Sequence, residues 1–166
     1  MTYYPDLSPY QYLEGADSQS LNIGWLDGSM PYPTGTTSDE FRERLLEYCF
    51  SDNTVQLTRG FHVCNLDNCT CSLPPPPEHR GERVAYFGGS EIRVIGKSAI
   101  YAAPTLVYHY VVAHSYKPPD EFIEAVLAGP SPSSNEHQAL RRKMKEQEES
   151  YLASLREKTV KQSTKK

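Results

Sequence analysis

The stretch 83–104, RVAYFGGSEIRVIGKSAIYAAP, carries the strongest strand pattern in this chain of 166 residues. Apolar side chains alternate with polar ones along it, as the two faces of a pleated strand require. Gly88-Gly89 and Gly96-Lys97 divide the stretch at positions that suit tight turns. The pattern predicts three short strands that form a small antiparallel β-meander.

Helical periodicity is found on both sides of this meander. One helix is expected to begin near Ser38, where Thr37 and Glu40 have the spacing of a capping box. A second is expected to begin at Pro104, and a third to end at Gly129. The sequence therefore predicts an α+β fold, in which the meander packs with about three helices and a charged C-terminal helix follows.

Composition divides the chain into a body, a linker and a tail. Residues 1–128 are expected to form one compact α+β domain with a cysteine-rich loop at 60–73. Residues 129–135, GPSPSSN, read as a linker, and 136–166 as a charged C-terminal helix or tail. The body carries eight Lys and Arg against sixteen Asp and Glu, whereas the chain from residue 129 on carries nine against five. Because an acidic body repels nucleic acid, no nucleic-acid partner is expected, except through the basic tail.

Nothing in the sequence predicts membrane insertion or export. The chain has no run of about 18 apolar residues, so no membrane span is expected. The first 15 residues, MTYYPDLSPYQYLEG, lack the basic and apolar regions of a secretory signal. We therefore expect a cytoplasmic location, where clustered cysteines favour metal binding or redox chemistry over structural disulfides.

The segment GFHVCNLDNCTC, 60–71, contains three of the four cysteines and one of the five histidines. Structural zinc usually has four tetrahedral Cys and His ligands, and two of them are often cysteines separated by two to four residues. The candidate metal ligands are His62, Cys64, Cys69 and Cys71. The spacing predicts a structural zinc bound by the first two cysteines and by one or both of the other two candidates.

Two histidines outside the loop are possible substitute ligands. His109 or His114 could complete the zinc shell if one local ligand is missing. They lie five residues apart, which is about 140° around a helix, so at least one is expected to pack rather than bind. Cys49, the fourth cysteine, lies on the apolar face of the first helix and is expected in the core.

Two other interpretations of the cysteine loop remain open. Cys69 and Cys71 could form a redox pair, although C-x-C closes a strained ring and lacks the usual C-x-x-C arrangement. Alternatively, all three cysteines of the loop are reduced and bind nothing.

Signatures of known catalytic sites are absent. The sequence contains no H-E-x-x-H, no zinc-deaminase pattern and no glycine-rich phosphate loop. We therefore expect a small cytoplasmic binding protein that contacts a protein partner, and we assign no catalytic residue. The alternative is an enzyme, metal-dependent or not, with a pocket lined by cysteine and histidine.

Five stretches of the body match the motifs of one family. They are YYPDLSPYQY (3–12), LNIGWLDG (21–28), TRGFHVC (58–64), GSEIRV (89–94) and YAAPTLVYHYVVAHSYKPPDEFIEAV (101–126). On these motifs, which cover about residues 3–127, the chain resembles a family of small uncharacterised bacterial proteins, a domain of unknown function. The loop of that family looks shorter, H-x-C-x-x-C, whereas here the second cysteine comes later and a C-x-C follows. The resemblance implies one compact domain and no particular activity.

Overall fold

The computed structural model describes residues 2–11, 20–58, 60–67, 69 and 74–163. Within them the elements are, in chain order, β1 (Ser20–Asn22), α1 (Asp39–Cys49), β2 (Glu78–Arg80), β3 (Arg83–Ala85), β4 (Glu91–Ile95), β5 (Ile100–Pro104), α2 (Leu106–Ala113), α3 (Asp120–Ala128) and α4 (Asn135–Ser163). The fold class is therefore α+β, as predicted. Among the helices described, none has both the length and the apolar character needed to cross a membrane.

β4 and β5 form the hairpin at the centre of the fold. They pair antiparallel from Glu91 opposite Pro104 to Ile95 opposite Ile100. β1 joins the other edge of β5 in parallel, so the strand order is β1-β5-β4 and the sheet is mixed. β3 does not continue the predicted meander, because it pairs with β2 in a separate sheet of two strands.

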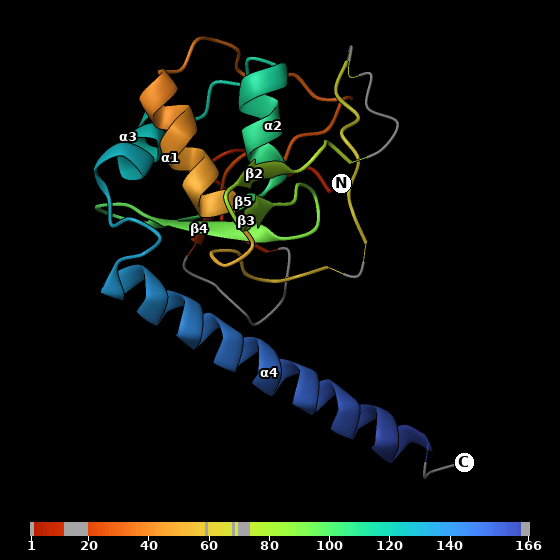
Figure 1. The fold of residues 1–166 in the computed structure, drawn as a ribbon. Helices are drawn as coiled ribbons and strands as arrows, with labels where there is room; N and C mark the ends of the chain where they lie inside the picture. The colour runs from red at the N-terminus through yellow and green to blue at the C-terminus, as the bar shows by residue number, and fades with distance from the viewer. Residues whose placement is uncertain (1, 12–19, 59, 68, 70–73, 164–166) are drawn as a thin grey trace.

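Helices α1, α2 and α3 lie together on one side of the three-stranded sheet (Figure 1). Ile92 and Val94 of β4 are fully buried in the core that these helices complete. Phe41 of α1 and Phe122 of α3 meet there edge to face, with their ring centroids 6.3 Å apart. Cys49 is also fully buried in this core, as predicted, and burial raises the pKa of its thiol.

The cap of α1 differs from the one predicted. The Ser38 hydroxyl accepts a hydrogen bond from the Phe41 N–H at 3.1 Å, so Ser38 itself is the N-cap. The Thr37 hydroxyl instead accepts a bond from Nε of Arg42, also at 3.1 Å. Two neighbouring hydroxyl residues both suit a cap, and the capping-box spacing selected the wrong one of them.

The other face of β4 carries a buried ion pair. Nη1 of Arg93 lies 2.8 Å from the Glu91 carboxylate, and the two residues are 0% and 1% exposed. The Tyr10 hydroxyl donates to that carboxylate at 2.9 Å, and the Arg93 guanidinium stacks 4.7 Å over the Tyr10 ring. Oε1 of Gln56 accepts a further bond from Nη2 of Arg93 at 3.0 Å. Through Tyr10, this network attaches the N-terminal segment, residues 2–11, to the sheet.

Helix α4 docks on the body through its first three turns, His137 to Met144. His137 is fully buried, its Nε2 lies 2.7 Å from the Arg93 carbonyl oxygen, and its ring packs edge to face with Tyr48. Met144, two turns later, is also buried. Residues 151–154 are exposed, and the helix runs away from the other elements towards the C-terminus (Figure 1).

We predict that Glu91→Gln lowers the free energy of unfolding by about 3–5 kcal/mol, because it removes the carboxylate that pairs with the buried Arg93 guanidinium. Urea denaturation of the purified protein measures this loss. The control is Glu124→Gln, which removes an exposed ion pair with Lys97 and should cost about 1 kcal/mol or less. Equal losses for the two variants would contradict the structural role given to the buried pair.

Candidate metal site

Along residues 61–67 of the cysteine loop, side chains alternate between the inside and the outside. Cys64 and Leu66 are 5% and 3% exposed, whereas Phe61 and Val63 point outward. The His62 N–H donates to the Gly88 carbonyl oxygen at 2.8 Å. Gly88 has φ +89°, and a Cβ there would lie 2.3 Å from the His62 oxygen. Gly88 therefore does not form the predicted hairpin turn but makes room for this loop.

A second contact holds the loop from the other side. The Asn65 side-chain amide donates to the Asp27 carboxylate at 2.8 Å. A Cβ on Gly28 would lie only 2.1 Å from the Asn65 carbonyl oxygen, so glycine permits this close approach. Hydrogen bonds from the Ser29 hydroxyl and N–H, and then from Asn65, lower the pKa of Asp27 to about 2. Asp27 is therefore a charged acceptor at neutral pH.

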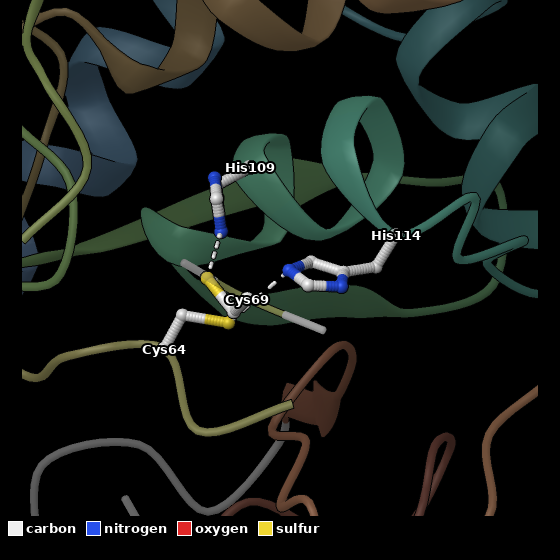
Figure 2. Close-up of side chains that lie close together, drawn as sticks. All are labelled: Cys64, Cys69, His109 and His114. Atoms are coloured by element: carbon white, nitrogen blue, oxygen red, sulfur yellow. Dashed lines mark hydrogen bonds between the residues drawn. The ribbon is translucent and has the colours of Figure 1, made fainter. Parts of the chain in front are cut away.

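The loop brings two cysteines opposite two histidines of the α2 segment (Figure 2). Sγ of Cys64 lies 3.3 Å from Nε2 of His114, and Sγ of Cys69 lies 3.6 Å from Nε2 of His109. One ligand atom from each of the four residues lies within 4.8 Å of all the others. Cys64 is buried and the other three are half-buried. We call these four residues the Cys/His cluster.

The structure corrects the expectation that His109 and His114 could not face the same ligand. That expectation assumed a regular helix through both residues, but α2 ends at Ala113. His114 has φ −116° and ψ 7°, and Ser115 follows at φ +54°. The chain therefore leaves the helical path at His114, and its ring comes to lie 5.1 Å from the His109 ring, centroid to centroid.

The cluster has the charge state and ligand types that a metal site needs. Burial lowers the pKa of both His109 and His114, and the nearby His114 lowers that of His109 further. The two rings are therefore neutral at pH 7 and each keeps a lone pair. Two sulfur and two imidazole ligands suit zinc and similar soft or borderline metals. The arrangement can hold one metal ion.

The predicted ligands are thus brought together only in part. Cys64 and Cys69 join the cluster with both substitute histidines. His62 does not join them: it lines a small hollow with Trp25 and Glu91. Two residues of extended chain span about 6.6 Å, which separates His62 from the position of Cys64. Cys71 lies outside the described residues, so its role as a ligand or as a redox partner of Cys69 stays a prediction.

A comparison with protein-family models identifies the family of this chain. A model described as "Domain of unknown function (DUF7919)" matches residues 2–127. The chain belongs to this family. All four residues of the Cys/His cluster lie inside the DUF7919 match, whereas α4 lies beyond its end. No curated protein and no solved structure matches the chain.

The backbone at Ser115 gives a prediction about the site. Ser115 is exposed and left-handed, so Ser115→Gly should leave stability and affinity for added Zn²⁺ unchanged or slightly higher. Ser115→Val should cost about 1–2 kcal/mol, because a β-branched residue resists this conformation. It should also weaken metal binding, because His114 moves. Urea denaturation and competition with a chelator measure both effects, and a Val variant as tight and stable as the Gly variant would refute the argument.

Proposed function

We propose that the Cys/His cluster binds one Zn²⁺ ion, that this ion has a structural role, and that the loop it holds forms part of a surface for a protein partner. The observation that carries the proposal is the convergence of two thiols and two imidazoles, from segments 40 or more residues apart, within 4.8 Å. Two cysteines with two histidines are one of the usual ligand sets of structural zinc.

The separations in the cluster support zinc. Zinc lies about 2.3 Å from sulfur and about 2.0–2.1 Å from imidazole nitrogen, so a tetrahedral ion separates S from N by about 3.6 Å. The two measured S–N distances, 3.3 and 3.6 Å, are close to this value. These two cysteine–histidine pairs therefore already have the separation that a tetrahedral zinc ion requires, and all four ligand atoms lie within 4.8 Å of one another.

The number of ligands supports a structural role rather than a catalytic one. Catalytic zinc sites usually have three protein ligands and leave the fourth position to water or substrate. Here four side chains converge, and together they fill a tetrahedral shell. Bound zinc would cross-link Cys64 and Cys69 of the loop to the end of α2. This cross-link would restrict the conformations of the loop.

The outer side of the loop supports the proposed contact with a protein. Phe61 is 57% exposed, and it lines a shallow hollow together with Leu57 and Tyr86, which are 78% and 50% exposed. Large apolar side chains that gather on a surface are typical of interaction sites. We call Leu57, Phe61 and Tyr86 the apolar patch.

Metal content is the first test of the proposal. The purified protein should contain about one equivalent of zinc, and Cys64→Ser, Cys69→Ser, His109→Gln and His114→Gln should each lose most of it. Zinc present at 1,000 times its Kd should add about 4 kcal/mol to the free energy of unfolding, which a chelator removes. Elemental analysis by mass spectrometry and urea denaturation make the two measurements.

Matched variants separate the proposed ligands from the other candidates. Cys49→Ala and His79→Gln should keep their zinc, because Cys49 is buried in the core and His79 is exposed on β2. His62→Gln and Cys71→Ser should also keep it if the Cys/His cluster is the complete shell. Loss of zinc in either of these two, with retention in the His109 and His114 variants, would contradict the ligand set.

The apolar patch gives a second prediction. In extracts of cells that naturally express the protein, Leu57→Ser/Phe61→Ser should weaken a complex at least about 30-fold, the effect of losing one strong anchor residue. Size-exclusion chromatography of tagged protein measures the fraction that elutes as the complex. Met30→Ser, which changes an exposed methionine outside the patch, should elute as the unchanged protein does. A double variant that keeps its zinc and the full complex would exclude the patch as the contact.

The alternative function, a Cys/His enzyme, makes a different prediction about the thiols. A catalytic thiolate next to histidine reacts fast with alkylating reagents at neutral pH. Cysteines bound to zinc in a filled shell should react slowly until a chelator removes the ion. Fast alkylation of Cys64 or Cys69 in protein purified without metal would favour the enzyme.

A further inference from the structure

A cavity of about 430 Å³ lies between the β4–β5 turn, α3 and the segment that follows α3. It shares no residue with the Cys/His cluster or with the apolar patch. Its volume is within the range of small-molecule sites, about 300–1,000 Å³. Tyr101 and Ala125, which are 2% and 5% exposed, form its floor, and exposed residues of α3 and of the turn form its rim.

The floor of the cavity holds a polar group that the fold does not use. Among the described residues, none forms a hydrogen bond with the Tyr101 hydroxyl, although the Tyr101 ring packs in the core 5.7 Å from Phe122, centroid to centroid. The hydroxyl oxygen itself is not fully buried and reaches the cavity. Gly96 leaves the ring edge accessible, because a Cβ there would lie 2.7 Å from Cε2 of Tyr101. The hydroxyl is therefore available to a ligand that enters the cavity.

The charged side chains at the rim of the cavity favour a ligand of positive charge. Lys97 forms an ion pair with Glu124 across the mouth. Glu121 lines the same cavity, and no cation among the described residues pairs with its carboxylate. The rim therefore has a net charge of −1. Burial raises the pKa of Tyr101, and the charges of Glu121 and Glu124 raise it further, which agrees with a negative potential inside the cavity.

We propose that this cavity is a binding site for a small organic cation, an amine with a compact apolar body. The apolar body would lie over Ala125 and Ala128, a polar atom would bond to the Tyr101 hydroxyl, and the ammonium would face Glu121 at the rim. The proposal does not depend on zinc, because no residue of the Cys/His cluster lines the cavity.

Three probes that share an aromatic body test the choice of charge. 2-Phenylethylamine is a cation at pH 7, 2-phenylethanol is neutral and 3-phenylpropanoate is an anion. Each is titrated into the ¹⁵N-labelled full chain in the zinc-loaded form, or as purified if it holds no zinc. Two-dimensional NMR follows the amide signals of Gly96, Ser98 and Gly129. The amine should give saturable shifts at these amides and bind about three- to tenfold more tightly than the alcohol, and the anion should bind more weakly still.

Variants then locate the contacts. Glu121→Gln should weaken amine binding about two- to fivefold, because it removes a partly exposed charge. Tyr101→Phe keeps the ring in the core and should leave binding of 2-phenylethylamine unchanged, because this probe has no second polar atom for the Tyr101 hydroxyl. Ala128→Leu, at an exposed position of α3, should fill the cavity and abolish the shifts, whereas Ala153→Leu on the exposed face of α4 should not affect them.

The outcomes are decisive in both directions. The site is supported if the preference for the amine is reduced by Glu121→Gln, if binding is abolished by Ala128→Leu, and if both are kept with Ala153→Leu. The proposal is overturned if the amine causes no saturable shift at these three amides. It is equally overturned if the alcohol or the carboxylate binds as tightly as the amine, or if Ala128→Leu leaves amine binding unchanged.

Discussion

Two thiols and two imidazoles within 4.8 Å of one another are the constraint on which the candidate site depends. The cysteines lie on a loop without helix or strand, and the histidines on the end of α2. The loop can approach α2 because Gly88 and Gly28 leave room for its backbone, and His114 leaves the helical path because α2 ends at Ala113. Each of these local features serves the same end, which is to bring soft ligands to one point. A zinc ion there would convert an irregular segment into a fixed surface.

The two faces of β4 have different environments. One face of β4 packs into the apolar core with α1 and α3, and the other carries the buried Glu91–Arg93 pair with Tyr10. Replacing such a pair with apolar residues often leaves stability unchanged, so the main effect of the pair is the fixed position that it gives Tyr10 and the N-terminal segment. The Cys/His cluster and the cavity over Tyr101 share no residue, so a substitution in one leaves the residues of the other unchanged.

The sequence predicted what depends on local pattern and missed what depends on distant pairing. Periodicity and turn residues indicated the strands at 91–95 and 100–104, the four helices and the stop of α3 at Gly129. The parallel pairing of β1 with β5 joins residues about 80 apart, and no local pattern encodes it. The site followed the same rule. The spacing indicated Cys64 and Cys69 as ligands. Whether both histidines could face one ion was judged by assuming a regular helix through them, and that assumption was wrong at the C-cap of α2.

Zinc K-edge X-ray absorption on the purified protein tests the central claim most directly, because it separates sulfur from nitrogen or oxygen ligands and detects imidazole by the outer atoms of its ring. The Cys/His cluster predicts two sulfur atoms at about 2.3 Å and two imidazole nitrogens at about 2.0–2.1 Å, with no further ligand. Three sulfurs would mean that Cys71 takes the place of a histidine. An oxygen ligand in the shell would mean an open, water-bearing site. Either result would contradict a closed shell of Cys64, Cys69, His109 and His114.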